Sequence, residues 1–364
     1  MRAETNQKTQ IAIVGAGIAG CIAALALSKH FQVILLDKHT HPLAKAGECL
    51  PPAARRILKL LGIEHLLDNG PHLVSQGMLS YWGSSQPAVV DNLRNPDGLG
   101  WHLNRTQFET QLRLQCLRSG VQCIWPAKPI TSKFHDNRWL LEYEHKQQTL
   151  SLSANVVIDA SGRHSVFARQ QGVTRKQYDK LVSIWLSAQF SVSKNMALIS
   201  SSQRGWWYSA PIPSDQFGGA INNAQSRIVS WQLNAEQLQK QDHQDVEQFL
   251  QQARMTHGFK TLIEQLIPNT QTLHGLVAAN TSKLEQVAGK QWYAIGDTAM
   301  SFDPLSSQGM YNAMASAMQL CDMLIHNGLH GRDTACHYQQ QMDKVWQHYL
   351  HHKSLYYKQA GMMA

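Results

Sequence analysis

The chain lacks the features that mark membrane, secreted and metal-binding proteins. Its 364 residues contain no apolar run that approaches the roughly 18 residues of a membrane span. The first ten residues are polar and lack the apolar core of a signal peptide. The six cysteines form no CxxC pair and no cluster with metal-ligand spacing. We therefore expect a cytoplasmic protein with reduced thiols, no bound metal and no membrane partner.

A basic stripe is also missing. The formal net charge is +8, but no run of lysine and arginine is interleaved with aromatic residues on which bases would stack. We therefore expect no nucleic-acid partner. Hydrophobic residues make up 43% of the chain, which is typical of a globular protein. A chain of this length can bury a large core, and we expect two interleaved lobes.

A glycine-rich turn near the start of the chain carries the first functional signal. Residues 11–14 predict a buried strand, residues 17–30 an alanine-rich helix, and residues 32–37 a second strand. In such a βαβ unit, glycines permit a tight turn, a close approach to a pyrophosphate and close helix packing. An acidic residue at the end of the second strand can accept from ribose hydroxyls. The residues expected to bind a dinucleotide here are Gly15, Gly17, Ile18, Ala19, Gly20, Asp37 and Lys38.

A second signal lies nearly at the other end of the chain. Gly296 and Asp297 follow the apolar strand predicted at residues 291–295, and ligands collect at the carboxyl ends of such strands. Pro304 and Gly309 then lead into a helix rich in small residues, which begins with Met310. We expect Asp297 to hold a ribityl chain and the helix start to stabilise negative charge on a reduced flavin ring. The two signals together predict an FAD site.

Two further segments contain candidate FAD-binding residues. Asp159 and Gly162 follow a strand predicted at residues 154–159, where the aspartate either caps neighbouring backbone or holds the pyrophosphate region. A helix is predicted over residues 105–118, with Asn104 as its N-cap and a buried stripe of apolar residues. Arg105 opens this helix and either forms a surface salt bridge or, as the family resemblance described below implies, reaches the FAD phosphate.

The three glycine-acid stretches resemble those of FAD-dependent monooxygenases with the hydroxybenzoate-hydroxylase fold. The run from Gly47 and Glu48 to Pro51 and Pro52 is similar to the flavin-dependent halogenase branch, as are residues 205–213. Halogenases use a lysine soon after the Gly-Glu segment, but no lysine occurs at residues 60–127. Within this group the chain most resembles the LodB- or GoxB-type flavoproteins encoded with quinoprotein amino-acid oxidases.

This resemblance implies hydroxylation of a tryptophan in a precursor quinoprotein amino-acid oxidase, at the start of cysteine tryptophylquinone formation. It implies FAD as cofactor, NADPH or NADH as transient reductant, and O2 as co-substrate. Glu48 either orients the substrate or caps the following helix, and it is also a candidate cofactor ligand. Trp206, Trp207 and Tyr208 are candidates for the substrate pocket, although a period-two strand separates Trp207 from the other two. Two alternatives are an FAD-dependent hydroxylase or halogenase of a free small aromatic, and a flavin-stabilised chaperone of the oxidase precursor.

The expected fold is α/β. It combines a Rossmann-like FAD-binding lobe, an interleaved antiparallel-sheet substrate lobe and C-terminal helices. Residues 1–80, 101–180 and 276–330 are expected to form the FAD-binding lobe, and residues 81–100 and 181–275 the substrate lobe. Residues 331–364 are expected to form a C-terminal helix whose last part is solvated.

Overall fold

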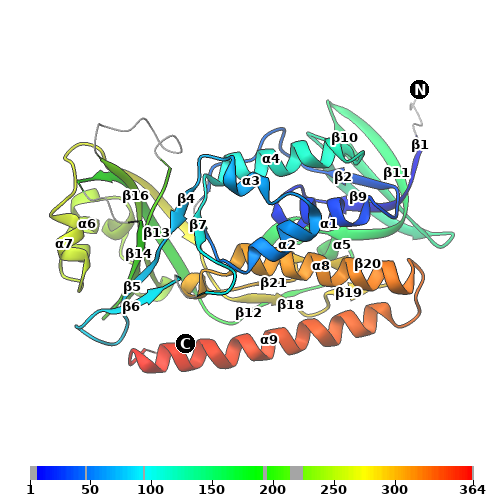
Figure 1. The fold of residues 1–364 in the computed structure, drawn as a ribbon. Helices are drawn as coiled ribbons and strands as arrows, with labels where there is room; N and C mark the ends of the chain where they lie inside the picture. Colours follow the sequence, from blue (N-terminus) through cyan, green and yellow to red (C-terminus); the bar gives the residue numbers. More distant parts are fainter. Residues whose placement is uncertain (1–5, 46, 93–94, 192–194, 214–223, 363–364) are drawn as a thin grey trace.

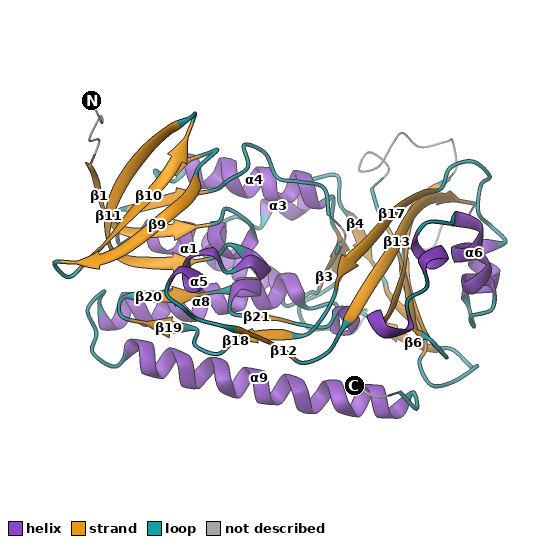
Figure 2. Ribbon diagram, turned by 180° about the vertical axis from the view of Figure 1, so that it is seen from behind, coloured by secondary structure: helices purple, strands orange, loops and turns teal. Residues whose placement is uncertain are grey.

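The computed structural model describes residues 6–45, 47–92, 95–191, 195–213 and 224–362. Two β-sheets, of eight and seven strands, lie at opposite ends of the molecule, with long helices around the eight-stranded sheet (Figure 1). Seen from behind, short helices cover the outer side of the seven-stranded sheet (Figure 2). The predicted α/β fold class is confirmed.

The eight-stranded sheet contains the predicted βαβ unit. Its strands are β1 (Asn6–Val14), β2 (Val33–Leu36), β8 (Gln122–Ile124), β9 (Lys128–His135), β10 (Arg138–His145), β11 (Gln148–Asp159), β19 (Ala288–Gly289) and β20 (Trp292–Ala294). The order β20-β11-β1-β2-β8 is parallel throughout, and β9, β10 and β19 add antiparallel pairs. Because β1 and β20 run in the same direction, the early and late motifs lie at one edge of the sheet.

The seven-stranded sheet is antiparallel except at one pair. In spatial order its strands are β17 (Thr272–Ala278), β13 (Leu181–Phe190), β16 (Gln225–Asn234), β15 (Gly205–Pro211), β14 (Met196–Ser202), β5 (Gly77–Tyr81) and β6 (Ala88–Asp91). The strands within the predicted segment, β13 to β17, pair antiparallel, and the parallel pair joins β14 to β5, which comes from the predicted FAD-binding segment. The chain passes through the eight-stranded sheet between these two strands, so no hairpin forces them to be antiparallel. The predicted lobe boundaries stay a prediction.

Two three-stranded sheets connect the larger ones. The first contains β12 (Arg175–Gln177), β18 (Ser282–Leu284) and β21 (Met300–Ser301), and the second contains β3 (Cys49–Leu50), β7 (Gly100–His102) and β4 (Leu73–Ser75). Both lie between the large sheets in the ribbon view (Figure 1). They hold together the segments through which the chain passes from one large sheet to the other.

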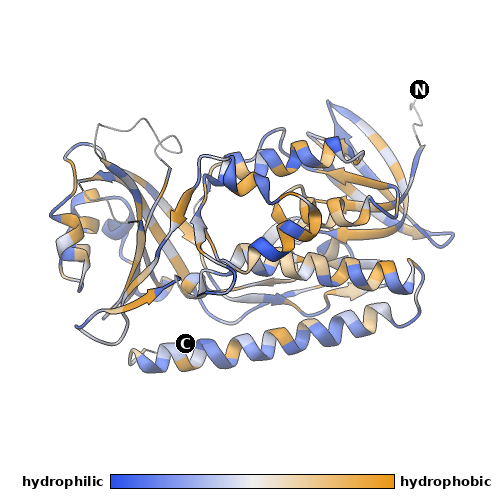
Figure 3. Ribbon diagram, in the orientation of Figure 1, coloured by the Kyte–Doolittle hydropathy of each residue, from blue (hydrophilic) through white to orange (hydrophobic). Residues whose placement is uncertain are grey.

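Helices complete the molecule. They are α1 (Ile18–Leu27), α2 (Ala54–Leu61), α3 (His65–Asp68), α4 (Arg105–Arg118), α5 (Val166–Gln170), α6 (Val246–Arg254), α7 (Phe259–Ile263), α8 (Gly309–Asn327) and α9 (Thr334–Gln359). Every residue of α1 is buried, and its small side chains let it pack against α4 and α8. Its apolar character stands out beside the mixed surface of α9 (Figure 3). Within the described residues, no helix has both the length and the apolar character needed to cross a membrane.

Two helices test the sequence predictions directly. The Asn104 side chain accepts from the backbone N–H of Gln107 and caps α4 as predicted. The predicted stripe is fully buried: Phe108, Leu112 and Cys116. Helix α9 runs along the molecule past both large sheets (Figure 1). The expectation that its end is solvated is wrong for Lys353 and Tyr357, which are only 8% and 6% exposed.

Candidate functional site

The early glycines form a tight turn between β1 and α1. Gly15 has a φ of 109°, and a Cβ there would lie 2.3 Å from the carbonyl oxygen of Ala160. A Cβ on Gly20 would lie 1.8 Å from the carbonyl oxygen of Gly15. By contrast, a Cβ on Gly17 would meet no atom within 4 Å, and Gly17 is the N-cap of α1. Gly15 and Gly20 therefore allow close packing, while Gly17 leaves open space at a positive helix end, as a phosphate requires.

A second helix end faces the same region. Helix α8 begins at Gly309 without a side-chain cap, and a Cβ on Gly309 would meet no atom within 4 Å. The preceding turn, Pro304–Ser306, is capped by Asp303, whose Oδ1 accepts from the N–H of Leu305 at 2.8 Å. Since the first N–H groups of a helix have no intrahelical acceptor, this end can also receive an anion.

A cavity of about 340 Å³ lies between these helix ends and the seven-stranded sheet. The predicted site residues that line it are Gly17, Ile18, Ala19, Glu48, Arg105, Gly162, Trp206, Tyr208, Asp297, Pro304, Gly309 and Met310. The structure places the other predicted residues outside this lining: Gly15, Gly20, Lys38, Asp37, Asp159, Trp207 and Gly296. The early, middle and late motifs therefore converge on one cavity, although not every residue within them faces it.

Asp37 is engaged within the protein. Its carboxylate accepts from the backbone N–H groups of Ala16 and His39, each at 2.7 Å. The Arg113 guanidinium lies 3.1 Å from its Oδ2 and donates to the Ala16 carbonyl oxygen. These bonds fix the glycine turn and leave Asp37 as a partly exposed carboxylate beside it. Sequence reasoning missed Arg113, yet the polar residues Arg105, Glu109 and Arg113 recur at every fourth position beside the apolar stripe of α4.

The two aspartates that follow strands have different environments. Asp159 is fully buried, and its carboxylate accepts from the N–H groups of Ser161 and Ala168 at 3.0 and 2.9 Å. Burial raises its pKa despite these bonds. This environment favours the structural interpretation of Asp159. Asp297 instead keeps 47% of its side chain exposed, lines the cavity and lies 3.9 Å from the Arg163 guanidinium.

Glu48 is a buried carboxyl group at the cavity wall. Its Oε1 accepts from the N–H of Gly47 at 2.9 Å, and its Oε2 has no hydrogen-bond partner among the described residues. Burial raises its pKa to about 7, against a smaller lowering by nearby Arg105. The alternative in which Glu48 caps the following helix is wrong, because α2 has Ala53 as its N-cap and no side-chain cap bond. One of its two carboxyl oxygens is therefore buried without a partner in the described part of the chain.

A small ion-pair group lies beside Glu48. Arg105 donates to Glu109 at 3.0 Å and to the carbonyl oxygen of Gly47 at 3.0 Å. Lys45, which sequence reasoning did not single out, lines the cavity and places its Nζ 2.9 Å from Glu109. Two cations therefore share one buried carboxylate, which leaves net positive charge at this side of the cavity.

The aromatic segment divides between two faces of β15, as the period of a strand predicts. Trp206 and Tyr208 line the cavity. Trp207 points to the opposite face, where its ring stacks on Trp231 at a centroid distance of 4.9 Å. There it belongs to an apolar cluster that includes Phe249 of α6. Trp207 therefore forms part of the core, and Trp206 and Tyr208 remain as candidates for a substrate wall.

The residues present fit an FAD molecule. Gly17 and Gly309 give open backbone at two helix N-termini, and the half-exposed carboxylate of Asp297 is a hydrogen-bond acceptor on the cavity wall. The cavity between them is bounded on the far side by aromatic rings, as a flavin with a stacked substrate requires.

Comparison with known families settles the assignment. Residues 8–347 match the model described as FAD binding domain. The chain belongs to this family. LodB of Marinomonas mediterranea, named as an FAD-dependent oxidoreductase, is 24% identical over 347 residues, which cover 93% of this chain and 89% of LodB. The tryptophan 2-halogenase of Chondromyces crocatus is 24% identical over 326 residues, and the match covers 85% of this chain but 60% of that enzyme.

Solved structures show the same fold. The flavin-dependent halogenase CmlS matches with a TM-score of 0.82 at 20% identity, over 98% of this chain and 65% of that one. QhpG, described as a peptidyl tryptophan dihydroxylase essential for tryptophylquinone cofactor biogenesis, matches with a TM-score of 0.75 at 18% identity. That match covers 97% of this chain and 76% of QhpG. At these identities the structural likeness concerns the fold alone, and the family match over residues 8–347 makes this chain an FAD enzyme.

Proposed function

We propose that this protein is an FAD-dependent monooxygenase that hydroxylates a tryptophan side chain of a precursor quinoprotein amino-acid oxidase, during cysteine tryptophylquinone formation. The observation that carries the proposal is the single cavity lined by the FAD motifs on one side and by Trp206 and Tyr208 on the other. The similarity to LodB over most of both chains, and the fold shared with a peptidyl tryptophan dihydroxylase, support this substrate.

The cofactor supplies the redox chemistry, by activating O2 for transfer to an electron-rich ring. The protein holds it by the open turn at Gly17, by the α8 end at Gly309 and by the carboxylate of Asp297. We propose that NADPH or NADH serves as a transient reductant. Arg105 and Lys45 add positive charge that attracts these phosphorylated molecules toward the cavity.

Glu48 is the residue that we propose to orient the substrate. Its Oε2 lies buried without a partner in the described part of the chain, so an indole N–H that donates to it replaces an unsatisfied group with a hydrogen bond. An ionised Glu48 would attract the positive charge that develops on the ring during oxygen transfer, and its pKa of about 7 allows both protonation states near neutral pH. Trp206 and Tyr208 offer flat apolar surfaces against which an indole ring can pack.

The test uses the purified protein loaded with FAD, with NADPH or NADH and O2. One reaction contains the precursor oxidase, a second contains a peptide that carries its tryptophan, and a third contains free tryptophan. We expect oxygen incorporation into the precursor or peptide, measured by intact mass and located by fragmentation. Rapid hydroxylation of free tryptophan, with an unmodified precursor, would overturn the proposed protein substrate.

A halogenase acting on a free small aromatic is the second candidate. The halogenase relatives favour it, and Lys45 places an ammonium group at the cavity. Lys45 is held by Glu109, however, and precedes the Gly-Glu segment instead of following it. Repeating the three reactions with added bromide separates the candidates: a brominated product would support the halogenase, and a product that contains only added oxygen would support the hydroxylase.

A further inference from the structure

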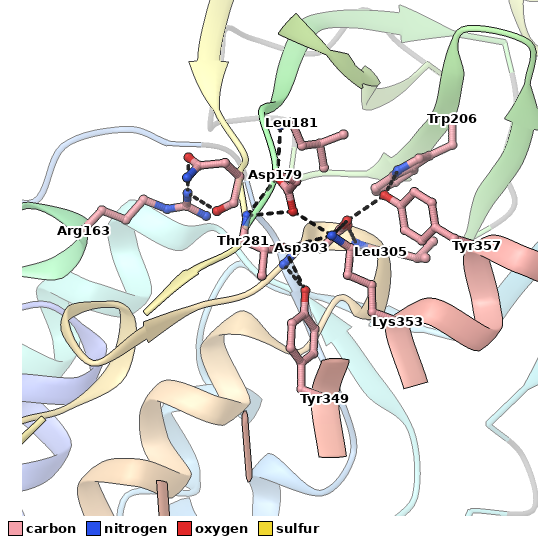
Figure 4. Close-up of polar contacts among 11 residues, drawn as sticks. Arg163, Asp179, Leu181, Trp206, Thr281, Asp303, Leu305, Tyr349, Lys353 and Tyr357 are labelled. Carbon is pink, nitrogen blue, oxygen red and sulfur yellow. Dashed lines mark hydrogen bonds and ion pairs between the residues drawn. The ribbon is translucent and has the colours of Figure 1, made fainter. Parts of the chain in front are cut away.

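One face of α9 is buried although most of this helix is exposed. Tyr349, Lys353 and Tyr357 recur at every fourth position, so they share one face of the helix. Figure 4 shows that all three side chains point toward Asp303 and its neighbours Asp179 and Thr281. A buried lysine between two tyrosines is not required for packing a helix against a surface, and its contacts indicate a more specific arrangement.

The Tyr357 hydroxyl connects two walls of the cavity. It donates to Oδ2 of Asp303 at 2.6 Å and accepts from the indole N–H of Trp206 at 3.0 Å. Asp303 belongs to the turn before α8, and Trp206 belongs to β15 of the seven-stranded sheet. Both residues line the cavity. One hydroxyl group therefore sets the separation between the flavin-side turn and the substrate-side wall.

Tyr349 supports the same turn from the preceding position on the helix face. Its hydroxyl oxygen accepts from the backbone N–H of Asp303 at 2.8 Å. Asp303 in turn caps the segment that leads to Gly309, through its bond with the Leu305 N–H. Both the side chain and the backbone of Asp303 are thus held by α9, and the position of the α8 start depends on them.

Lys353 contacts the two segments through which the chain passes between the large sheets. Its Nζ lies 2.6 Å from Oδ2 of Asp179, 3.1 Å from the Thr281 hydroxyl and 3.7 Å from Oδ2 of Asp303. Asp179 precedes β13 and Thr281 follows β17, so they mark the points where the chain enters and leaves the seven-stranded sheet on its second passage. The Asp179 carboxylate also accepts from the Thr281 N–H at 3.1 Å, which ties the two crossings together.

We propose that Tyr357 is a positioning residue, which fixes the Asp303 turn relative to Trp206 and thereby sets the geometry of the flavin end of the cavity. Tyr349 and Lys353 hold the same turn and the adjoining crossings from the same helix face. The inference rests on the FAD-binding part of the proposed function and adds a role for α9, which contributes no residue to the cavity lining itself.

The test compares Tyr357→Phe with Tyr356→Phe. The first variant removes only the hydroxyl that joins Asp303 to Trp206, and the second removes a hydroxyl from a neighbouring tyrosine that is 55% exposed. FAD affinity is measured by titration of the apoprotein, and the emission and absorption spectra of the bound flavin report its surroundings. We expect Tyr357→Phe to weaken FAD binding about tenfold, because a hydrogen bond to a buried carboxylate is lost. Its bound flavin should also become more emissive, and Tyr356→Phe should match the wild type.

A purely structural role gives a different result. It would lower the melting temperature of the Tyr357→Phe apoprotein but leave FAD affinity and flavin spectra unchanged, and that outcome overturns the inference. Tyr349→Phe provides an independent check, because it leaves the N–H of Asp303 without its acceptor. We expect the same spectral change there. A wild-type protein that binds no FAD overturns the proposed function together with this inference, whereas normal FAD affinity and flavin spectra in Tyr357→Phe overturn this inference alone.

Discussion

The two faces of β15 show how neighbouring residues serve different ends. Trp207 packs into an aromatic cluster with Trp231 and the helices behind the sheet. Trp206 and Tyr208, on the opposite face, border the cavity together with polar residues such as Ser230. Both tryptophans are buried, but Trp207 is enclosed by the aromatic cluster, whereas Trp206 also borders the cavity. A strand places both kinds of residue in one short segment because its side chains alternate.

The same division recurs in the eight-stranded sheet. Gly15 and Gly20 face protein atoms, whereas Gly17 faces open space. Asp159 is enclosed by backbone donors, whereas Asp297 is half-exposed at the cavity. We expect Gly15, Gly20 and Asp159 to be required for folding, and Gly17 and Asp297 to be required for cofactor binding. Substitutions within the pairs can separate these two effects.

The largest effect is expected from Trp207→Ala. Removing a large buried aromatic side chain destabilises a protein by about 4 kcal/mol, because both transfer energy and packing are lost. Urea unfolding of the apoprotein measures this free energy. Trp206→Phe on the other face keeps an aromatic ring and loses only the N–H bond to Tyr357, so it should cost about 1 kcal/mol. A loss from Trp207→Ala no larger than this would contradict the role of Trp207 in the core.

Asp159→Ala should have the next largest effect, a loss of about 3 kcal/mol in the free energy of unfolding. The change leaves the buried N–H groups of Ser161 and Ala168 without an acceptor, and each such group is costly. The loss should be present in the apoprotein, where no ligand contributes. If the apoprotein were unaffected and only FAD binding fell, Asp159 would be a cofactor ligand instead.

Asp297→Ala should behave in the opposite way. Because the side chain is half-exposed, the melting temperature of the apoprotein should change little. FAD affinity should fall about 30-fold, or about 2 kcal/mol, through loss of a charged acceptor. Asp297→Asn keeps an acceptor and should retain part of the affinity. Co-expression of Asp297→Ala with the precursor oxidase also tests the chaperone alternative: precursor modification that proceeds without FAD would contradict the redox role.

The parts of the molecule that were predicted from sequence are those with local physical causes. The glycine turn, the capped and striped α4, and the alternation along β15 each follow from spacing within one segment. The role of Arg113, the parallel pairing of β5 with β14 and the burial of Lys353 depend on segments distant in the chain. The pattern of α9 shows a lysine between tyrosines, but only the fold supplies the carboxylates that make its burial favourable.

The last comparison concerns Glu48, the buried acid at the cavity wall. Its folded-state pKa of about 7 exceeds the ordinary value of 4.5, because burial disfavours the charged form. The folded protein therefore binds the proton more tightly than the unfolded chain does, and stability falls as pH rises through this window. Below the window Glu48 is neutral in both states and has no such cost, whereas above it the full cost is present. The expected slope is about 1 kcal/mol per pH unit.

Glu48→Gln should remove this contribution, since the amide carries no charge at any pH in the window. The difference in unfolding free energy between the apoprotein and this variant should grow in favour of the variant as pH rises from mildly acidic to neutral. Asp303→Asn is unsuitable as a control because Asp303 pairs with Lys353, so Glu144→Gln, which alters an exposed carboxylate on β10, serves as the control. If the difference in unfolding free energy between the wild type and Glu48→Gln is constant with pH, the Glu48 carboxyl group is solvated in the apoprotein. Its proposed bond to the indole N–H would then replace water, and the gain in orienting the substrate would be correspondingly smaller.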